Sequence, residues 1–253
     1  MMRISAVIIT YNEENHISRC LDSLKSIADE IVVVDSFSKD KTKEICLSMG
    51  VCFFENPFEG FTAQKNHAMK LATFDYILSL DADEYLSDEL KESIQNVKEN
   101  GANVHGYTMN RLNRYRDKWI KTCGWYPDRK IRFWDRRQGE WHGGKVHEIV
   151  KLQPSAQSAH LEGDLLHISY ENVSQFIKKI QEYSEIYAQD NAHKKKSSVF
   201  KIIYKTIFSF MKAYFIKGGI LDGYEGLLIS GSIAIGVFYK YSKLLEANRS
   251  FKH

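Results

Sequence analysis

The 253-residue chain is poor in the residues that interrupt or cross-link a fold. It has only 3 prolines and 15 glycines, and 43 % of its residues are hydrophobic and 26 % charged. This balance is typical of a chain that buries a globular core, and it excludes collagen-like, coiled-coil and disordered proteins. The 4 cysteines form no C-x-x-C pair and no zinc-ligand spacing. We therefore expect reduced, mostly buried thiols and no disulfide framework.

Long apolar runs are also missing. The apolar run near the N-terminus is about six residues long, too short for the core of a signal peptide, so secretion is not expected. The longest charge-free run in the C-terminal part, residues 226–239, has 14 residues. A bilayer-crossing helix needs roughly 18 to 20 such residues, so no spanning helix is expected.

Two phosphate-binding motifs are absent. No G-x-G-x-x-G follows the first apolar run, and no G-x-x-x-x-G-K-[ST] occurs. The sequence therefore supports neither a dinucleotide-binding site nor a P-loop. Any phosphate has to be held by other means, such as a carboxylate-bound metal ion.

Charge is distributed unevenly along the chain. From residue 191 onward there are 11 basic and 3 acidic residues, against 24 basic and 29 acidic residues before that point. The negative charge of the larger part argues against nucleic-acid binding, and no RNA-binding or helix-turn-helix signature occurs. We expect no nucleic-acid partner.

Apolar patterning predicts strands that alternate with helices over the first 80 residues. Short β-branched runs predict strands, and apolar residues three and four apart predict helices between them. The expected strands are 4–10, 30–35, 51–55 and 76–80, and the helices contain Ile17 to Leu24, Ile45 to Met49, and 61–72. This order predicts an α/β fold with an open, mainly parallel sheet, helices on both faces and ligands beyond the carboxyl ends of the strands.

Polar residues follow three of these strands. Thr10, Tyr11, Asn12 and Glu13 follow the first strand, Asp35 and Ser36 end the second, and Asp81, Ala82 and Asp83 follow the fourth. Any one of these carboxylates could be a helix cap, but three at neighbouring strand ends predict one shared crevice. Asp81 and Asp83 suit Mg²⁺ or Mn²⁺ that bridges substrate phosphates. Tyr11 offers a ring for a base, unless it is an ordinary half-buried tyrosine, and Asp35 offers an acceptor for a base or ribose.

Four motifs in this order resemble the inverting family 2 glycosyltransferases of GT-A fold. They are T-Y-N-E-E at 10–14, V-V-D-S-F-S-K-D-K-T at 33–42, Q-K-N-H-A at 64–68 and D-A-D-E at 81–84. The resemblance implies that residues 10–13 hold the nucleobase and ribose and that Asp35, beside Ser36, reads the base. It also implies that Gln64 and Lys65 lie near the nucleotide or sugar. Asp81 would then lie near the ribose, and Asp83 would be the main ligand of an Mg²⁺ or Mn²⁺ ion.

Two later segments narrow the resemblance. W-Y-P-D-R-K-I-R-F-W at 125–134 and G-E-W-H-G-G-K-V-H-E at 139–148 look like the lipopolysaccharide-core β-glucosyltransferase subgroup. This subgroup implies transfer of a hexose, glucose from UDP-glucose, to an inner-core sugar such as heptose. The acceptor would be a lipid-linked core oligosaccharide. Trp125 and Trp141 are candidate stacking platforms for that acceptor.

An inverting transfer needs a carboxylate that takes the proton of the acceptor hydroxyl. The family often supplies it from an E-D pair that this chain does not obviously have. Glu148 is our candidate base, with Asp128 and Asp135 in reserve, and His147 could complete the metal site as an imidazole ligand. The alternative for His147 and Glu148 is a surface pair at the end of a strand.

The C-terminal part predicts a second region. We expect a catalytic domain at 1–170 and a helical, basic and aromatic region at 171–253 that begins with a helix at 172–192. Segment 199–245 suits contact with an anionic membrane surface, packing on the body, or a homodimer contact. The expected location is the cytoplasm, at the cytoplasmic face of the inner membrane.

Three other functions remain open. The nearest is an enzyme of the same fold that glycosylates polyprenyl phosphate. A catalytically inactive sugar-nucleotide-binding protein is the second. A phosphoacceptor receiver domain, with Asp35 at its strand end, is the third, although it would need paired acidic residues directly after the first strand.

Overall fold

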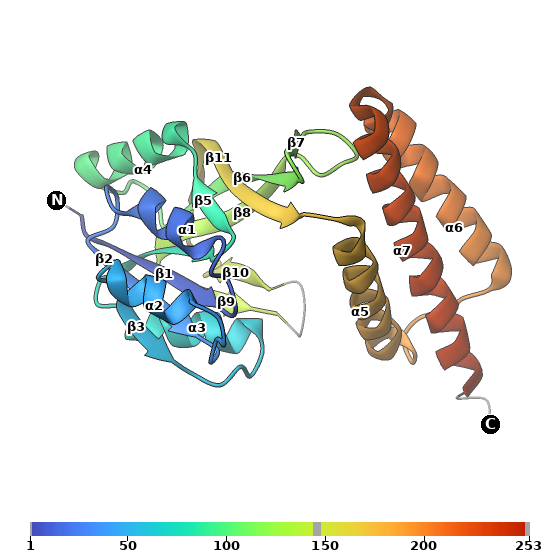
Figure 1. Cartoon of the computed structure of the whole chain (residues 1–253), viewed down its shortest axis with the longest axis horizontal. Coiled ribbons are helices and arrows are strands. Elements are labelled where there is room, and N and C mark those ends of the chain that lie inside the picture. The colour runs from blue at the N-terminus through green and yellow to red at the C-terminus, as the bar shows by residue number, and fades with distance from the viewer. Residues whose placement is uncertain (1, 144–147, 251–253) are drawn as a thin grey trace. The chain divides into compact units, whose positions relative to one another are not determined.

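The computed structural model describes residues 2–143 and 148–250. One half of its main sheet is parallel, with strand order β3-β2-β1-β4 (Figure 1). These strands are β1 (Ile4–Thr10), β2 (Glu30–Asp35), β3 (Cys52–Glu55) and β4 (Tyr76–Asp81). Thr10 is in register with Asp35, and Ile9 with Asp81, so three of the predicted strand-end clusters share one edge of the sheet.

The other half of the sheet is antiparallel. It continues in the order β8-β6-β11-β5, and β7 pairs with β6. Its strands are β5 (Glu84–Leu86), β6 (Gly106–Tyr115), β7 (Lys118–Ile120), β8 (Asp128–Asp135) and β11 (Ser158–Tyr170). A separate two-stranded sheet joins β9 (Gly139–His142) to β10 (Ile149–Leu152). The predicted open α/β sheet is confirmed, and its parallel pairing is confined to the first four strands.

Helices cover both faces of the parallel half because its strands are apolar on both sides. On β1, Ala6 and Ile8 belong to one buried cluster and Val7 to another. The first cluster contains residues of α1, α2 and α4, and the second contains residues of α3. The helices are α1 (Ile17–Leu24), α2 (Thr42–Ser48), α3 (Phe61–Leu71) and α4 (Asp88–Asn100).

The chain divides into two compact units. The first comprises Met1–Leu112 and Asp128–His167, and the second comprises Asn113–Pro127 and Ile168–His253. The second unit therefore includes a segment, 113–127, that the sequence division assigned to the catalytic part. Within the second unit, α7 lies between α5 and α6 (Figure 1). The elements are α5 (Val173–Asn191), α6 (Val199–Met211), η1 (Lys212–Ile216), η2 (Gly219–Asp222) and α7 (Gly223–Ser250).

One helix corrects the expectation that no segment could cross a bilayer. The helical stretch Gly219–Arg249 has 31 residues and an 18-residue window of mean hydropathy 1.3, which meets the length and composition of a membrane span. The expectation rested on the length of the charge-free run at 226–239. That criterion was too strict, because a membrane-spanning segment tolerates a few charged residues. A core helix of a soluble protein meets the same two conditions, and 28 % of this window is buried.

The four cysteines predict a simple labelling pattern. All four are free thiols, and only Cys52 is exposed. Burial and the Glu84 carboxylate raise the pKa of Cys20, and burial raises that of Cys46 to about 12. We expect one thiol per chain to react rapidly with a chromogenic disulfide at pH 8 and the other three to react after denaturation. A Cys52→Ser variant should lose the rapid phase; a rapid phase that persists would contradict this assignment.

Candidate functional site

The loops after β1 and β2 are joined to each other by hydrogen bonds. The Asn12 amide donates to Ser38 Oγ at 2.8 Å, and the Lys39 amide donates to Asn12 Oδ1 at 2.8 Å. The Glu13 amide donates to Thr42 Oγ1 at 2.8 Å. Asn12 has a φ of 54°, a left-handed conformation that asparagine tolerates better than most residues. The predicted residues 10–13 therefore form a fixed loop at the carboxyl edge of the sheet.

Two predicted nucleotide contacts from the first loop differ in exposure. Tyr11 is 53 % exposed, so its ring is accessible to a ligand. Thr10 is buried, and its Oγ1 has no hydrogen-bond partner among the described residues. Buried hydroxyl groups normally form a hydrogen bond. The hydroxyl of Thr10 is therefore available to form one with a ligand or a water molecule.

Asp35 and Gln64 are buried and engaged with protein groups. Asp35 Oδ2 accepts from the Ser38 amide at 2.6 Å, and its Oδ1 accepts from Ser38 Oγ at 2.5 Å. Gln64 Nε2 donates to Ser36 Oγ at 3.1 Å, while Gln64 Oε1 accepts from Asn56 at 2.8 Å. These contacts fix the loop after β2 to helix α3. A base-reading role for Asp35, and ligand contacts by Ser36 and Gln64, stay predictions.

Lys65 joins two of the predicted acidic residues. Its side chain is 1 % exposed, and its Nζ lies 2.8 Å from Asp81 Oδ1 and 2.9 Å from Glu148 Oε1. The same ammonium lies 4.4 Å from the centre of the Trp141 ring. Residues 65, 81 and 148 are far apart along the chain, and the fold brings all three together. Glu148 is thus at the strand ends, in contact with Lys65 and close to Asp81.

The ion pairs continue on the other side of Asp81. Arg132 Nη2 lies 3.1 Å from Asp81 Oδ2 and 2.9 Å from Glu84 Oε1. Glu84 also receives the Asp81 amide at 3.0 Å and lies 3.3 Å from Arg111 Nη1. Arg111 Nη2 in turn lies 2.7 Å from Asp128 Oδ2. Acidic and basic side chains alternate along this row of contacts, which we call the charge chain. Its members, in spatial order, are Glu148, Lys65, Asp81, Arg132, Glu84, Arg111 and Asp128.

The charge chain holds Asp81 ionised. Burial raises the pKa of the Asp81 carboxyl, but the charges of Lys65 and Arg132 outweigh burial and bring that pKa well below its usual range. Both carboxylate oxygens already face a cation. Asp81 is therefore less suited to hold a metal ion than Asp83.

Asp83 lies beside His167, a residue for which the sequence predicts no role. His167 Nε2 on β11 is 3.2 Å from Asp83 Oδ2. A carboxylate and an imidazole suit Mn²⁺, and Mg²⁺ needs only one or two carboxylates when substrate phosphates and waters complete its shell. The described residues contain no group of three possible ligands, and these two donors fit an ion that is completed by substrate. The predicted ligand His147 lies outside the described residues.

The reserve candidates for the base lie at different ends of β8. Asp128 begins the strand and belongs to the charge chain. Asp135 ends it and pairs with Tyr76, the first residue of β4, so it lies at the edge opposite Asp81. Its carboxylate is bound by Arg137 at 2.7 Å. Asp135 therefore lies away from the residues that meet at Lys65, and the choice of base stays a prediction.

The rings of both predicted stacking tryptophans take part in packing, and their contact with an acceptor sugar stays a prediction. Trp141 is buried, and its ring meets Trp134 edge-on with centroids 5.9 Å apart. Trp125 is partly buried and packs against Tyr170 and Phe176 beside the core of the second unit. Asn66 on α3 binds the backbone amide and carbonyl of Trp141, whose ring lies against the Lys65 ammonium.

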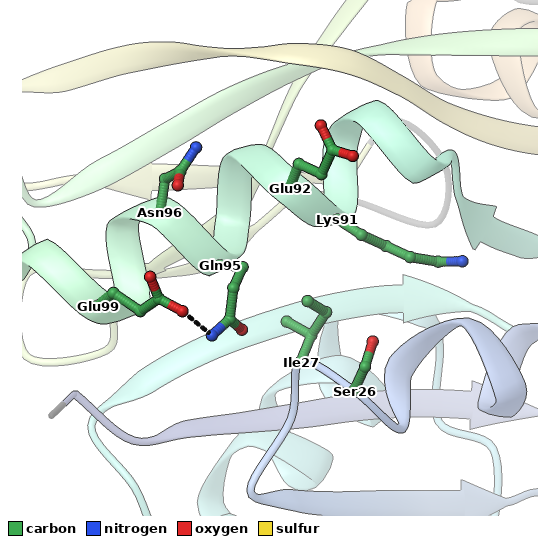
Figure 2. Close-up of a pocket in the computed structure, with 7 residues that line it drawn as sticks. All are labelled: Ser26, Ile27, Lys91, Glu92, Gln95, Asn96 and Glu99. Carbon is green, nitrogen blue, oxygen red and sulfur yellow. Dashed lines mark hydrogen bonds between the residues drawn. The ribbon is translucent and has the colours of Figure 1, made fainter.

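A surface pocket of about 480 Å³ lies elsewhere in the first unit (Figure 2). Side chains of α4, including Lys91 and Glu99, form one wall, and Ser26 and Ile27 form another. Ser26 and Ile27 precede β2, so the pocket is at the amino end of that strand. Ligand sites in open α/β sheets lie at the carboxyl ends, and this pocket therefore does not belong to the candidate site.

Comparison with known proteins decides the family. Residues 5–150, more than half of the chain, match the family described as glycosyl transferase family 2. The chain belongs to glycosyl transferase family 2. The matched segment contains the strand-end loops and every member of the charge chain, which are therefore the candidate active site of a glycosyltransferase.

Relatives of this glycosyltransferase match along nearly the whole chain. An uncharacterized glycosyltransferase of Rickettsia typhi is 31 % identical over 97 % of this chain and 88 % of its own. A lipopolysaccharide core biosynthesis glycosyltransferase, LpsC, of Rhizobium meliloti is 27 % identical over 96 % of this chain and 92 % of its own. Among solved structures, a glucosyl-3-phosphoglycerate synthase from Mycobacterium tuberculosis with Mn²⁺ and UDP is 20 % identical. That alignment covers 46 % of this chain and 45 % of the synthase, with a TM-score of 0.37.

The sequence predicts no role for Glu84 or His167 of this glycosyltransferase site. It offers Arg132 only as one of four arginines, with Arg129, Arg136 and Arg137, that could meet phosphates of the acceptor. Glu84 stands in the quoted D-A-D-E motif but had no assigned role. Arg132 is a buried arginine on β8, and His167 is a buried histidine on β11. A charged or ionisable residue inside a buried strand is a signal in itself, because such groups are rarely buried without a partner.

Proposed function

We propose that this glycosyltransferase moves a hexose, glucose from UDP-glucose, to an inner-core sugar of lipopolysaccharide such as heptose. The proposed reaction is metal-dependent and inverts the anomeric carbon. One observation carries the proposal: Lys65, Asp81 and Glu148 are in contact at the strand ends. Asp83, two residues after Asp81, contacts His167. The name of the Rhizobium relative supports the choice of acceptor.

In the proposed step, Glu148 acts as the base. Its Oε1 is anchored by Lys65, and among the described residues its Oε2 has no hydrogen-bond partner, so Oε2 is the atom to accept a proton. The acceptor hydroxyl loses its proton to Oε2 as its oxygen bonds to the anomeric carbon and the bond to UDP breaks. Tyr11 would stack on the uracil, and Thr10 Oγ1 would bind a polar atom of the nucleoside.

Asp83 and His167 would hold the Mg²⁺ or Mn²⁺ ion. When bound, that ion supplies positive charge that stabilises the departing diphosphate. Lys65 and Arg132 are already neutralised by carboxylates in the charge chain. These two cations are therefore committed to positioning Asp81 and Glu148, and a metal ion would supply further positive charge at the diphosphate.

A thermal-shift measurement with nucleotide sugars tests the donor and the metal together. A ligand that binds only the folded protein raises its Tm, so UDP-glucose with Mn²⁺ should raise Tm by several degrees, and more than UDP-glucose with a chelator. Asp83→Asn should lose the Mn²⁺-dependent part of that rise. Asp88→Asn, on the exposed start of α4, should keep it. Equal shifts with and without Mn²⁺ in the unchanged protein would contradict the metal role.

A catalytically inactive sugar-nucleotide-binding protein is the second candidate. It predicts the same Tm rise but no release of UDP over any acceptor. Release of UDP from UDP-glucose with an inner-core acceptor therefore separates the two functions.

A further inference from the structure

Helix α6 presents an apolar face that the protein leaves uncovered. Seven of its thirteen residues are large, apolar or aromatic and exposed, and Phe200 is 80 % exposed. Only Ile202 in this helix is buried. The exposed residues are Val199, Phe200, Ile203, Tyr204, Ile207, Phe208 and Met211, which we call the α6 face. Soluble proteins rarely leave so continuous an apolar surface in water, so this face points to an interaction.

The apolar surface continues into the turns after α6. Phe215 and Ile216 on η1 are exposed, and so are Ile220 and Leu221 on η2, with Leu221 82 % exposed. Two successive ring pairs on the α6 face, Phe200 with Tyr204 and Tyr204 with Phe208, lie nearly parallel. The surface therefore extends along one helix and its connection, a shape that suits an extended apolar boundary better than a small ligand.

The charges around this surface are mostly positive, and Asp222 at the end of η2 is paired with Lys118. Residues 191–221 contain seven lysines and no aspartate or glutamate. Lys212 and Lys217 are exposed on the turns, and Lys194, Lys195 and Lys196 are exposed before α6. Lys201 and Lys205 lie on the helix itself. An apolar face with a lysine-rich border is the pattern of helices that lie in the interface of an anionic membrane.

Helix α7 is held on its other side by polar contacts. Lys243 Nζ lies 3.2 Å from Glu185 on α5 and donates to the Gln181 carbonyl at 3.1 Å. Lys240 Nζ lies 3.8 Å from the centre of the Tyr187 ring on α5. A helix that crossed the bilayer would have to carry the polar α5 with it or leave these contacts. The packing therefore favours a helix bundle that lies on the membrane.

We propose that the α6 face and the turns η1 and η2 bind the surface of a bilayer that contains anionic lipids. The apolar side chains enter the boundary between headgroups and acyl chains, and the lysines contact lipid phosphates. A second copy of this chain fits less well, because a symmetric contact would bring the lysines of both copies together. The inference goes beyond the proposed sugar transfer and does not depend on it, since it uses residues of the second unit only.

Vesicle co-sedimentation tests the proposal with the full chain. We expect binding to vesicles of phosphatidylglycerol and phosphatidylethanolamine, and at least about tenfold weaker binding to phosphatidylcholine vesicles. A triple variant, Phe200→Ser, Ile207→Ser and Phe208→Ser, should bind anionic vesicles at least about tenfold more weakly. A matched variant of the first unit, Phe54→Ser and Phe58→Ser, also removes exposed rings and should bind as the unchanged protein does.

Further measurements separate surface binding from dimerisation and from a membrane-spanning helix. A Lys201→Gln, Lys205→Gln and Lys212→Gln variant removes charge without removing apolar surface, and it should lose mainly the preference for anionic lipid. Far-ultraviolet circular dichroism should show that each variant is folded. Vesicle binding that the serine variant retains would overturn the proposal, as would a serine variant that only converts dimers to monomers. Bound protein that resists extraction at alkaline pH would assign a spanning role to α7 and overturn the surface arrangement.

Discussion

Replacement of Arg132 with methionine should lower the free energy of unfolding by about 3–5 kcal/mol. Arg132 is buried and contacts both Asp81 and Glu84, and Glu84 is completely buried. Without the guanidinium, Arg111 remains as the one cation in contact with Glu84 within the charge chain, at 3.3 Å. A buried carboxylate that loses its closest partner is costly because no water replaces the lost charge. Urea unfolding followed by circular dichroism measures the change.

The neighbouring Arg129 provides the matched control. It lies on the same strand but is exposed, so Arg129→Met should change the free energy of unfolding by no more than about 0.5 kcal/mol. Adding Glu84→Gln to Arg132→Met should recover part of the loss, since a neutral amide needs no cation. Equal destabilisation by Arg129→Met and Arg132→Met would show that the charge chain contributes nothing specific.

At acid pH, the difference in the free energy of unfolding between the unchanged protein and the Arg132→Met variant should become smaller. The pKa of Asp81 is lower in the folded protein than in the unfolded chain, because the cations Lys65 and Arg132 outweigh burial. Its ion pairs therefore stabilise the fold fully above the unfolded pKa of about 4. That stabilisation is lost as the pH falls through the lowered, folded pKa.

The first four strands could be predicted from the sequence because their apolar residues are buried on both faces. The bounds of β1 and β2 agree with the expected runs at 4–10 and 30–35. The position of polar residues after those strands then followed from parallel pairing, since parallel strands end at one edge. Local sequence patterns determine these strands, so both the fold and the strand-end clusters could be predicted.

The charge chain could not be predicted in the same way. Asp81 and Arg132 meet because β8 packs antiparallel to β4, with Leu78 in register with Phe133. No local sequence pattern predicts the register between β4 and β8. The surroundings of Trp141 are hidden from the sequence for a related reason. Such a ring suits a sugar or a core equally well, and its packing against Lys65 and Trp134 is set by the fold.

Replacement of Glu148 with glutamine should reduce kcat by roughly 10²- to 10⁴-fold if Glu148 is the base. The amide keeps the size of the side chain and its carbonyl oxygen can still accept from Lys65, but it does not take a proton. The KM for UDP-glucose and the Tm rise with UDP should change little, since neither depends on proton transfer. Initial rates of UDP release at saturating acceptor measure the effect.

Glu140→Gln is the matched control, because Glu140 is an exposed carboxylate on the neighbouring strand β9. It should keep the rate of the unchanged enzyme. The same comparison tests the acceptor class. A polyprenyl phosphate attacks through an oxygen that is already ionised, so an enzyme with that acceptor would retain most of its rate in Glu148→Gln. Loss of rate with Tm and KM preserved therefore assigns both the proton acceptor and a hydroxyl nucleophile, and a retained rate argues for the phosphate acceptor.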